Sequence, residues 1–238
     1  AGCKAAHGRV RSELGVGPGH DRDDGEVALL APNGPEGQER PILDWGLATR
    51  ALGGEQESGD LHVVVHLPIG ALFAVVDGLG HGPEAARASR QAAAAIESNA
   101  TEAPDEILRR CHEELKETRG AVATIARVSE RDETVSWLGV GNVEGVLFPA
   151  NATERAQEYA PVRGGIIGSQ LPQLRPNAVS LHPGDVIVLA SDGVQPGFGR
   201  PARMQHAAQA IADQILREHG NPKDDALVLV ARYLGNRL

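Results

Sequence analysis

From Pro41 onward, apolar and polar residues follow two periods along the chain, and these predict strands and helices. Residues 61–67 (LHVVVHL) and 71–76 (ALFAVV) predict the two strands of a β-hairpin with its turn around 68–70. Pro83 suits the first turn of a helix, and the alanine-rich stretch behind it predicts close packing against a sheet. The other expected elements are strands at 42–52, 121–128, 134–140, 143–148, 178–182, 185–191 and 226–234, and helices at 83–99, from 104 to near Gly120 and at roughly 202–219.

The order of these elements favours one fold class. Hairpin follows hairpin, with two adjacent helices in the middle and a third near the end, whereas a doubly wound parallel sheet alternates strands with helices. A buried stripe along the second helix indicates that one of its faces packs on a sheet; its members are Ile107, Leu108, Cys111 and Leu115. We therefore expect an α+β fold in which antiparallel sheets carry helices on the outside.

Residues 1–40 differ from the rest of the chain in composition. They are rich in glycine, proline and charged residues and show little periodicity, as in GVGPGHDRDDGE and APNGPEGQER. This pattern predicts a mobile N-terminal extension ahead of a domain that spans residues 41–238. A short apolar stretch at 27–31 leaves open the alternative that part of the extension packs on the domain.

Composition narrows the classes of function. The net charge is −9 and only seven residues are aromatic, which argues against nucleic acid as a partner. We find no apolar stretch near the roughly 18 to 20 residues of a membrane helix and no apolar core of the signal-peptide kind. The two cysteines, Cys3 and Cys111, offer no disulfide framework and no metal-binding spacing. We expect a cytoplasmic protein that binds neither nucleic acid nor membrane.

Aspartates stand at the ends of several predicted strands. If the turn of the first hairpin centres near residue 69, cross-strand partners sum to about 138, which places Asp60 opposite residue 78 and beside Asp77. Asp192 ends the strand VIVLA, and Asp224 and Asp225 come directly before the strand ALVLV. If these two strands run antiparallel, their carboxylates also share one end of a sheet, so four strand-end aspartates can converge.

A cluster of carboxylates is costly unless something neutralises it, and oxygen-only clusters suit hard cations such as Mg²⁺ or Mn²⁺. In the segment VVDGLGHG (75–82), Gly78 permits close approach of the backbone and leaves its carbonyl available as a further ligand. The alternative is plain, because Asp-Gly after a strand is also a common turn signal. The metal hypothesis therefore depends on the whole set of aspartates.

The set, taken in order, resembles the metal-dependent Ser/Thr protein phosphatases of the protein phosphatase 2C type, in the bacterial branch of SpoIIE and the RsbX-type stressosome phosphatases. The resemblance runs from about residue 42 to the end of the chain. It is carried by SGD (58–60), DGLGHG (77–82), ASDG (190–193) and KDDALVLV (223–230), together with ILRRCHEELKETRGAVATI (107–125), VGNV (140–143) and GGIIGSQLPQ (164–173).

The resemblance implies a four-layer α/β/β/α sandwich, two antiparallel sheets flanked by helices, with two Mn²⁺ or Mg²⁺ ions. It implies that Asp77 is the catalytic residue that bridges both ions, with the Gly78 carbonyl on one of them. Asp60 would hold one ion, while Asp192 and Asp224 would hold the other. We favour Asp224 over Asp225 because the first aspartate of the family's final motif is the ligand.

The implied reaction is hydrolysis of phosphoserine or phosphothreonine by a water that the two ions activate. The implied partners are phosphorylated STAS-domain proteins of the RsbS/RsbR type, in the partner switching of a stress response. Two alternatives remain open: a catalytically inactive binding module with the same fold, and a metal-dependent hydrolase of small phosphate compounds. A short connection between Gly145 and Val179 indicates an open site, which favours protein substrates.

Other polar residues carry weaker signals. Some family members have a histidine two residues after the bridging aspartate; here that residue is Leu79, so His81 is a candidate acid or a loop histidine near the site. Arg119 is a candidate phosphate contact, although the predicted end of a helix suggests that it complements the helix dipole. His62 and His66 share one side of a strand, which indicates a solvated or inter-sheet face rather than a second metal site.

Overall fold

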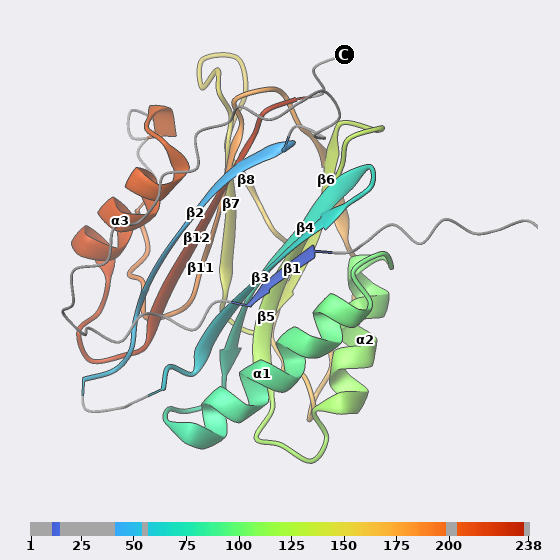
Figure 1. Ribbon diagram of the computed structural model, residues 1–238, viewed down its shortest axis with the longest axis vertical. Helices are drawn as coiled ribbons and strands as arrows, with labels where there is room; N and C mark the ends of the chain where they lie inside the picture. The colour runs from blue at the N-terminus through green and yellow to red at the C-terminus, as the bar shows by residue number, and fades with distance from the viewer. Residues whose placement is uncertain (1–10, 15–40, 54–56, 199–203, 236–238) are drawn as a thin grey trace, which may run out of the picture.

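The computed structural model describes residues 11–14, 41–53, 57–198 and 204–235. Two sheets face each other, with α1 and α2 on the outer side of one and α3 on the outer side of the other (Figure 1). The helices are α1 (Pro83–Ser98), α2 (Pro104–Glu114) and α3 (Ala208–His219). The strands are β1 (Arg11–Leu14), β2 (Leu43–Arg50), β3 (Asp60–Leu67), β4 (Gly70–Gly78), β5 (Ala121–Ser129), β6 (Thr134–Val140), β7 (Glu144–Phe148), β8 (Glu158–Tyr159), β9 (Val162–Arg163), β10 (Asn177–Ser180), β11 (Val186–Ala190) and β12 (Ala226–Tyr233).

The strand order defines a first sheet, β1-β3-β4-β5-β6-β10, and a second sheet, β2-β12-β11-β7-β8. All neighbours in both sheets are antiparallel except the short strand β9, which pairs with β6 in parallel. Alternating residues of each strand point to opposite faces, so each sheet contributes to two apolar layers. The predicted four-layer α/β/β/α sandwich is confirmed.

Three buried clusters fill the layers. One lies between the first sheet and α1 and α2, one lies between the two sheets, and one lies between the second sheet and α3. The alanines of α1 explain the close approach of that helix: Ala85, Ala88 and Ala93 have no exposed surface. A side chain at Gly78 would place its Cβ 2.2 Å from the Ala85 carbonyl oxygen, so this glycine lets the helix lie on the end of β4.

Several predicted boundaries differ from the structure. The second helix ends at Glu114 rather than near Gly120, because Thr118 turns back and donates from both its backbone N–H (2.9 Å) and its hydroxyl (2.7 Å) to the Leu115 carbonyl. The third helix begins at Ala208 rather than near 202. Residues 202 and 203 of the predicted helix lie outside the described residues. The two-residue strands β8 and β9 were not expected, since pairs of residues leave no periodic signal.

Of the predicted N-terminal extension, the structure describes only β1, which pairs antiparallel with β3. The apolar stretch at 27–31 lies outside the described residues. The division into residues 1–40 and 41–238 therefore stays a prediction. In the described part of the chain, no helix is long and apolar enough to cross a membrane.

The outer edge of the second sheet is formed by β2, and α3 reaches over it. Gln209 of α3 accepts a hydrogen bond from the Leu47 N–H (3.0 Å) and donates one to the Leu47 carbonyl (2.7 Å). Gly46 makes this contact possible, because a Cβ there would lie 2.3 Å from the Gln209 backbone. A side-chain amide thus occupies backbone groups that face away from β12.

Candidate metal centre

Asp60 and Asp77 form a direct cross-strand pair at one end of the first sheet. The prediction placed Asp60 opposite residue 78; the register is one residue shorter because the hairpin turn holds only Pro68 and Ile69. Both aspartates lie in phase with residues such as Val75 that face the second sheet. The hairpin therefore points two carboxylates into the same end of the space between the sheets.

The second sheet brings its aspartates to the same end. Strands β11 and β12 are antiparallel, and the ladder continues past Ala190 with a hydrogen bond from Ser191 N–H to the Leu227 carbonyl (3.0 Å). Asp192 therefore lies beside the start of β12, next to Asp224 and Asp225. The approach is so close that a Cβ at Gly193 would lie 1.8 Å from the Asp225 carbonyl oxygen.

Ser191 ties the two sheets together at this point. Its hydroxyl donates to Asp60 Oδ2 (2.6 Å) and accepts from the Leu227 N–H (2.9 Å), and the serine is buried. One side chain thus fixes a carboxylate of the first sheet against the backbone of the second. Sequence reasoning quoted this serine only as part of the ASDG string and gave it no role.

Asn142 holds a second carboxylate in place. Its side-chain amide, in the turn before β7, donates to Asp192 Oδ2 (2.7 Å). The residue belongs to the VGNV string, which was quoted only for the family resemblance. Its partner is 50 positions away in the chain, which is why local sequence patterns gave no sign of the contact.

The structure separates Asp224 from Asp225. The Asp225 carboxylate is buried and accepts hydrogen bonds from the backbone N–H groups of Leu52 (2.7 Å) and Gly59 (2.8 Å). Asp225 therefore fixes the segment that leads into Asp60. Asp224 is half-buried, and among the described residues its carboxylate accepts a hydrogen bond only from the adjacent backbone N–H of Asp225 (3.0 Å). This difference supports the choice of Asp224 as the ligand.

Burial and mutual repulsion raise the pKa values of the carboxylates. The pKa of Asp77 is raised first by burial and then by the charges of Asp60, Asp192, Asp224 and Asp225. Burial also raises the pKa of Asp60, with contributions from neighbouring aspartates, and the Ser191 hydroxyl partly offsets the shift. For Asp192, burial and Asp224 raise the pKa while Asn142 lowers it.

The donor chemistry of this cluster fits divalent ions. Among the described residues, no lysine or arginine forms an ion pair with Asp60, Asp77, Asp192 or Asp224. Within the same residues, no three His, Cys, Asp or Glu side chains are grouped tightly enough to hold an ion. The carboxylates are nevertheless close enough to raise one another's pKa. Oxygen donors of this kind suit Mg²⁺ or Mn²⁺.

The loop after Asp77 lies beside the segment that precedes β5. The N–H of Leu79 donates to the Gly120 carbonyl (3.1 Å), and Arg119 forms an ion pair with Glu84 in the first turn of α1. The interpretation of Arg119 as a helix-end residue is wrong, because α2 ends five residues earlier, at Glu114. His81 is exposed on the same loop, and its part in catalysis stays a prediction.

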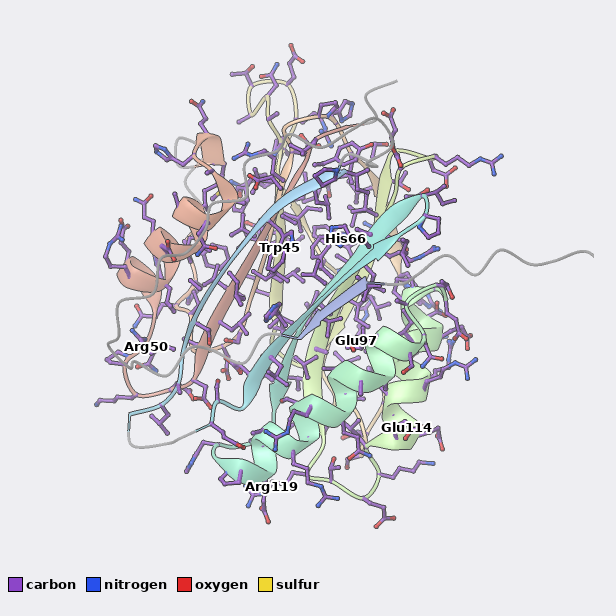
Figure 2. The ribbon with its side chains drawn as sticks, viewed as in Figure 1. Trp45, Arg50, His66, Glu97, Glu114 and Arg119 are labelled. Atoms are coloured by element: carbon purple, nitrogen blue, oxygen red, sulfur yellow. The ribbon has the colours of Figure 1, made fainter. Side chains whose placement is uncertain are left out.

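The remaining polar residues have structural positions. His62 is buried against the second sheet, with its ring centroid 6.0 Å from that of Trp45, and burial lowers its pKa to about 4. The inter-sheet interpretation is thus confirmed for His62, while His66, labelled in Figure 2, is half-buried near the far end of β3. Cys111 is buried in the layer under α2, as predicted, and burial raises its pKa to about 12.

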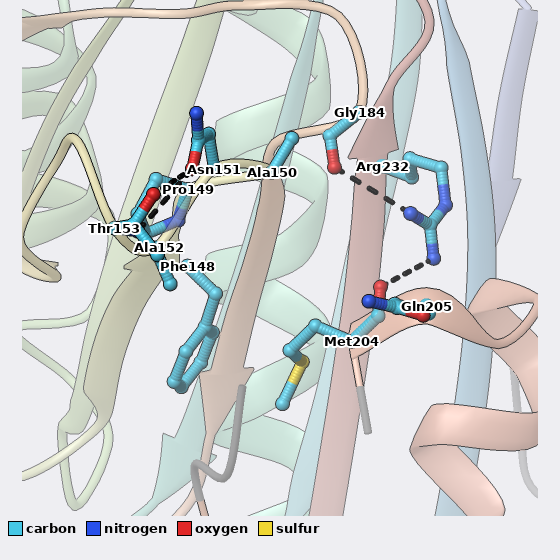
Figure 3. Close-up of a pocket in the computed structure, with 10 residues that line it drawn as sticks. All are labelled: Phe148, Pro149, Ala150, Asn151, Ala152, Thr153, Gly184, Met204, Gln205 and Arg232. Carbon is cyan, nitrogen blue, oxygen red and sulfur yellow. Dashed lines mark hydrogen bonds between the residues drawn. The ribbon is translucent and has the colours of Figure 1, made fainter. Parts of the chain in front are cut away.

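A pocket of about 490 Å³ lies at the opposite end of the second sheet (Figure 3). Phe148 and Met204 form apolar parts of its lining. The guanidinium of Arg232 is engaged by backbone carbonyls, including that of Met204 (2.9 Å). Since none of the described lining residues is acidic, and β11 and β12 separate the pocket from Asp192 and Asp224, it is not the candidate metal centre.

Comparison with known proteins places this chain in one family. Residues 70–234 match the family described as stage II sporulation protein E (SpoIIE). Phosphoserine phosphatase RsbX of Bacillus subtilis (strain 168) is 22% identical over 163 residues, which cover 68% of this chain and 80% of RsbX.

Solved structures agree. A chain from work on the bacterial stressosome, described as a modular system adapted to control secondary messenger signalling, is 35% identical with a TM-score of 0.75 and covers 80% of this chain and 99% of its own. RsbX in complex with magnesium has a TM-score of 0.69 at 21% identity, covering 82% and 97%. The phosphatase domain of SpoIIE from Bacillus subtilis has a TM-score of 0.67 at 19% identity, covering 82% and 64%.

These matches define the chain as a serine/threonine protein phosphatase of the protein phosphatase 2C type. Within that class it belongs to the SpoIIE family, in the branch that includes RsbX. The predicted family and activity are confirmed.

Proposed function

We propose that the chain is a cytoplasmic, Mn²⁺- or Mg²⁺-dependent phosphatase that removes phosphate from phosphoserine or phosphothreonine of STAS-domain proteins of the RsbS/RsbR type. The observation that carries this proposal is the group of carboxylates from both sheets that meets at one end without a lysine or arginine partner among the described residues. The likeness to RsbX and to a stressosome protein supports the choice of substrate.

In this proposal Asp77 holds both ions, and the Gly78 carbonyl adds a ligand to one of them. Asp60 holds one ion, and Asp192 and Asp224 hold the other. Divalent ions, when bound, supply an activated water and stabilise charge on the phosphoryl oxygens.

The protein contributes fixed positions for these ligands. Ser191 holds Asp60 through a buried hydrogen bond, Asn142 holds Asp192, and Asp225 pins the segment before Asp60 through two backbone N–H groups. Such contacts around metal ligands typically change metal affinity or activity by about 10- to 100-fold when removed. The serine and the asparagine are therefore part of what makes the cluster a site.

The test is phosphate release from a phosphorylated STAS-domain protein, with Mn²⁺ and with EDTA. We expect Mn²⁺-dependent release by the wild type and a loss of roughly 10³-fold in Asp77→Asn, because the variant lacks the carboxylate that would hold the ions that stabilise charge at the reaction centre. The matched control is Asp132→Asn, the same substitution on an exposed turn at the other end of the first sheet, and it should leave release unchanged.

The outcomes separate the rivals. Release from p-nitrophenyl phosphate that exceeds release from the phosphoprotein would favour a hydrolase of small phosphate compounds. A wild-type protein that binds no Mn²⁺ in calorimetry and releases no phosphate would contradict the enzyme and leave a binding module of the same fold.

A further inference from the structure

Arg119 lies in the segment that precedes β5, beside the loop that follows Asp77. The ladder between β4 and β5 pairs Gly78 with Ala121, and it continues past the strand with the hydrogen bond from Leu79 N–H to the Gly120 carbonyl (3.1 Å). The next pair in this register is Gly80 and Arg119. A Cβ built on Gly80 would lie 3.1 Å from Arg119 Nη1, so the guanidinium rests over Gly80, three residues beyond Asp77.

Arg119 forms an ion pair with Glu84, and this pair is weak. Arg119 and Glu84 form an ion pair at the base of α1, where Figure 2 labels Arg119, and their side chains are 52% and 68% exposed. Exposed pairs of this kind contribute little to stability and exchange readily. Arg155 gives the contrast, since it pairs with Asp185, whose side chain is only 1% exposed.

A guanidinium at this place has the chemistry for a phosphoryl group. Its planar N–H groups form paired, charge-assisted hydrogen bonds with phosphate oxygens, which an ammonium group does not match. The four aspartates supply only negative charge. A permanent positive charge nearby therefore favours the binding of a phosphate dianion beside them. Arg119 supplies such a cation beside the DGLGHG loop, and its partner Glu84 is exposed enough for a phosphate to displace it.

We propose that Arg119 binds the phosphoryl oxygens of the substrate and of the phosphate product, and that Glu84 holds the guanidinium until phosphate displaces it. This inference rests on the metal centre proposed above. It assigns Arg119 a role in binding and predicts opposite effects for the two members of the ion pair.

The test is calorimetric binding of inorganic phosphate to the Mn²⁺-loaded protein. We expect Arg119→Ala to weaken phosphate binding by about 10-fold or more, Arg119→Lys to fall between, and Glu84→Gln to tighten binding by about twofold to fivefold. In kinetics, Arg119→Ala should raise KM for both p-nitrophenyl phosphate and the phosphoprotein. The matched control is Arg110→Ala, which breaks the ion pair between Arg110 of α2 and Glu102. It should change neither the phosphate affinity nor KM.

Thermal unfolding of each variant shows whether it is folded, and Glu84→Gln tests the idea independently of Arg119. Equal phosphate affinity in wild type and Arg119→Ala would overturn the proposal, as would weaker binding in Glu84→Gln. A rise of KM for the phosphoprotein alone would also overturn it, because Arg119 would then contact the protein part of the substrate. Mn²⁺-dependent release by the wild type, measured first, tests the metal centre separately.

Discussion

The two ends of β11 carry carboxylates in opposite surroundings. Before the strand, Asp185 accepts hydrogen bonds from the N–H groups of Ala150 (2.9 Å) and His182 (2.9 Å) and pairs with Arg155 (2.6 Å). After the strand, Asp192 stands beside Asp60 and Asp77. Within the described residues Asp77 has no hydrogen-bond donor at all, and Asp60 has a single hydroxyl.

This difference separates a structural aspartate from the proposed metal ligands. Asp185 locks three segments together, and every hydrogen bond it accepts is made inside the protein. At the other end the fold brings like charges together and leaves them unneutralised, which native structures tolerate mainly where a ligand or an ion completes the site. The contrast supports the proposed position of the metal centre without reference to any relative.

The largest expected effect on stability concerns Asp185. Asp185→Asn should lower the free energy of unfolding by roughly 3 kcal/mol, because it leaves Arg155 without its charged partner and removes an acceptor from the backbone. Urea unfolding measures this loss, while Mn²⁺-dependent phosphatase activity below the unfolding temperature should stay near that of the wild type. Loss of activity in a fully folded variant would show that the two ends are not independent.

The pH dependence of the metal-free protein sharpens the contrast. Burial first, and then neighbouring charges, raise the pKa of Asp60 to about 7 and that of Asp77 to about 9 from the ordinary value of 3.8. Between pH 7 and 9 the unfolded carboxyls are ionised while the folded protein still holds protons, so the free energy of unfolding should fall as pH rises, by about 1 to 2 kcal/mol. His62 has the opposite effect below pH 6.5. Burial lowers its pKa to about 4, so the unfolded protein binds a proton there that the folded protein does not, and the free energy of unfolding falls as the pH falls.

Asp77→Asn is the matching variant. It should raise the stability of the metal-free protein at pH 9 and flatten its slope between pH 7 and 9, in urea titrations with EDTA present. Asp132→Asn, an exposed aspartate, serves again as the control. An unchanged slope in Asp77→Asn would contradict the prediction, because it would show that Asp77 holds no extra proton in the folded protein.

The smallest effect is expected at Asn142. Asn142→Ala removes the amide that orients Asp192, and we expect a loss of about 10-fold in Mn²⁺ affinity with little change in unfolding, because the contact is exposed. Calorimetric titration with Mn²⁺ measures it, and Asn151→Ala, in an exposed turn at the other end of the molecule, provides the control. If Asn142→Ala binds Mn²⁺ as tightly as the wild type, the contact between Asn142 and Asp192 stabilises the turn and has no effect on ion binding.

Much of the candidate site could be predicted from sequence because strands impose simple rules. A period of two and a short turn were enough to bring Asp60 beside Asp77, with an error of one residue in register. The roles of Ser191 and Asn142 could not be predicted in this way. Both depend on how two sheets pack, and their partners lie 131 and 50 positions away.

The same distinction holds for the helices. Proline and alanine predicted where α1 begins and how closely it packs. The predicted end of α2 was wrong because Thr118 forms hydrogen bonds that compete with the helix. The apolar stripe of α2 gives no sign of these hydrogen bonds.

The amide of Gln209 on Leu47 has a consequence for the behaviour of the chain in a crowded cell. An open edge strand is a template on which another chain can add by backbone pairing, the first step of many aggregates. In β2 a residue from a helix imitates the missing neighbour at mid-strand. The side chain of Gln209 thus blocks the middle of this edge strand against pairing with another chain.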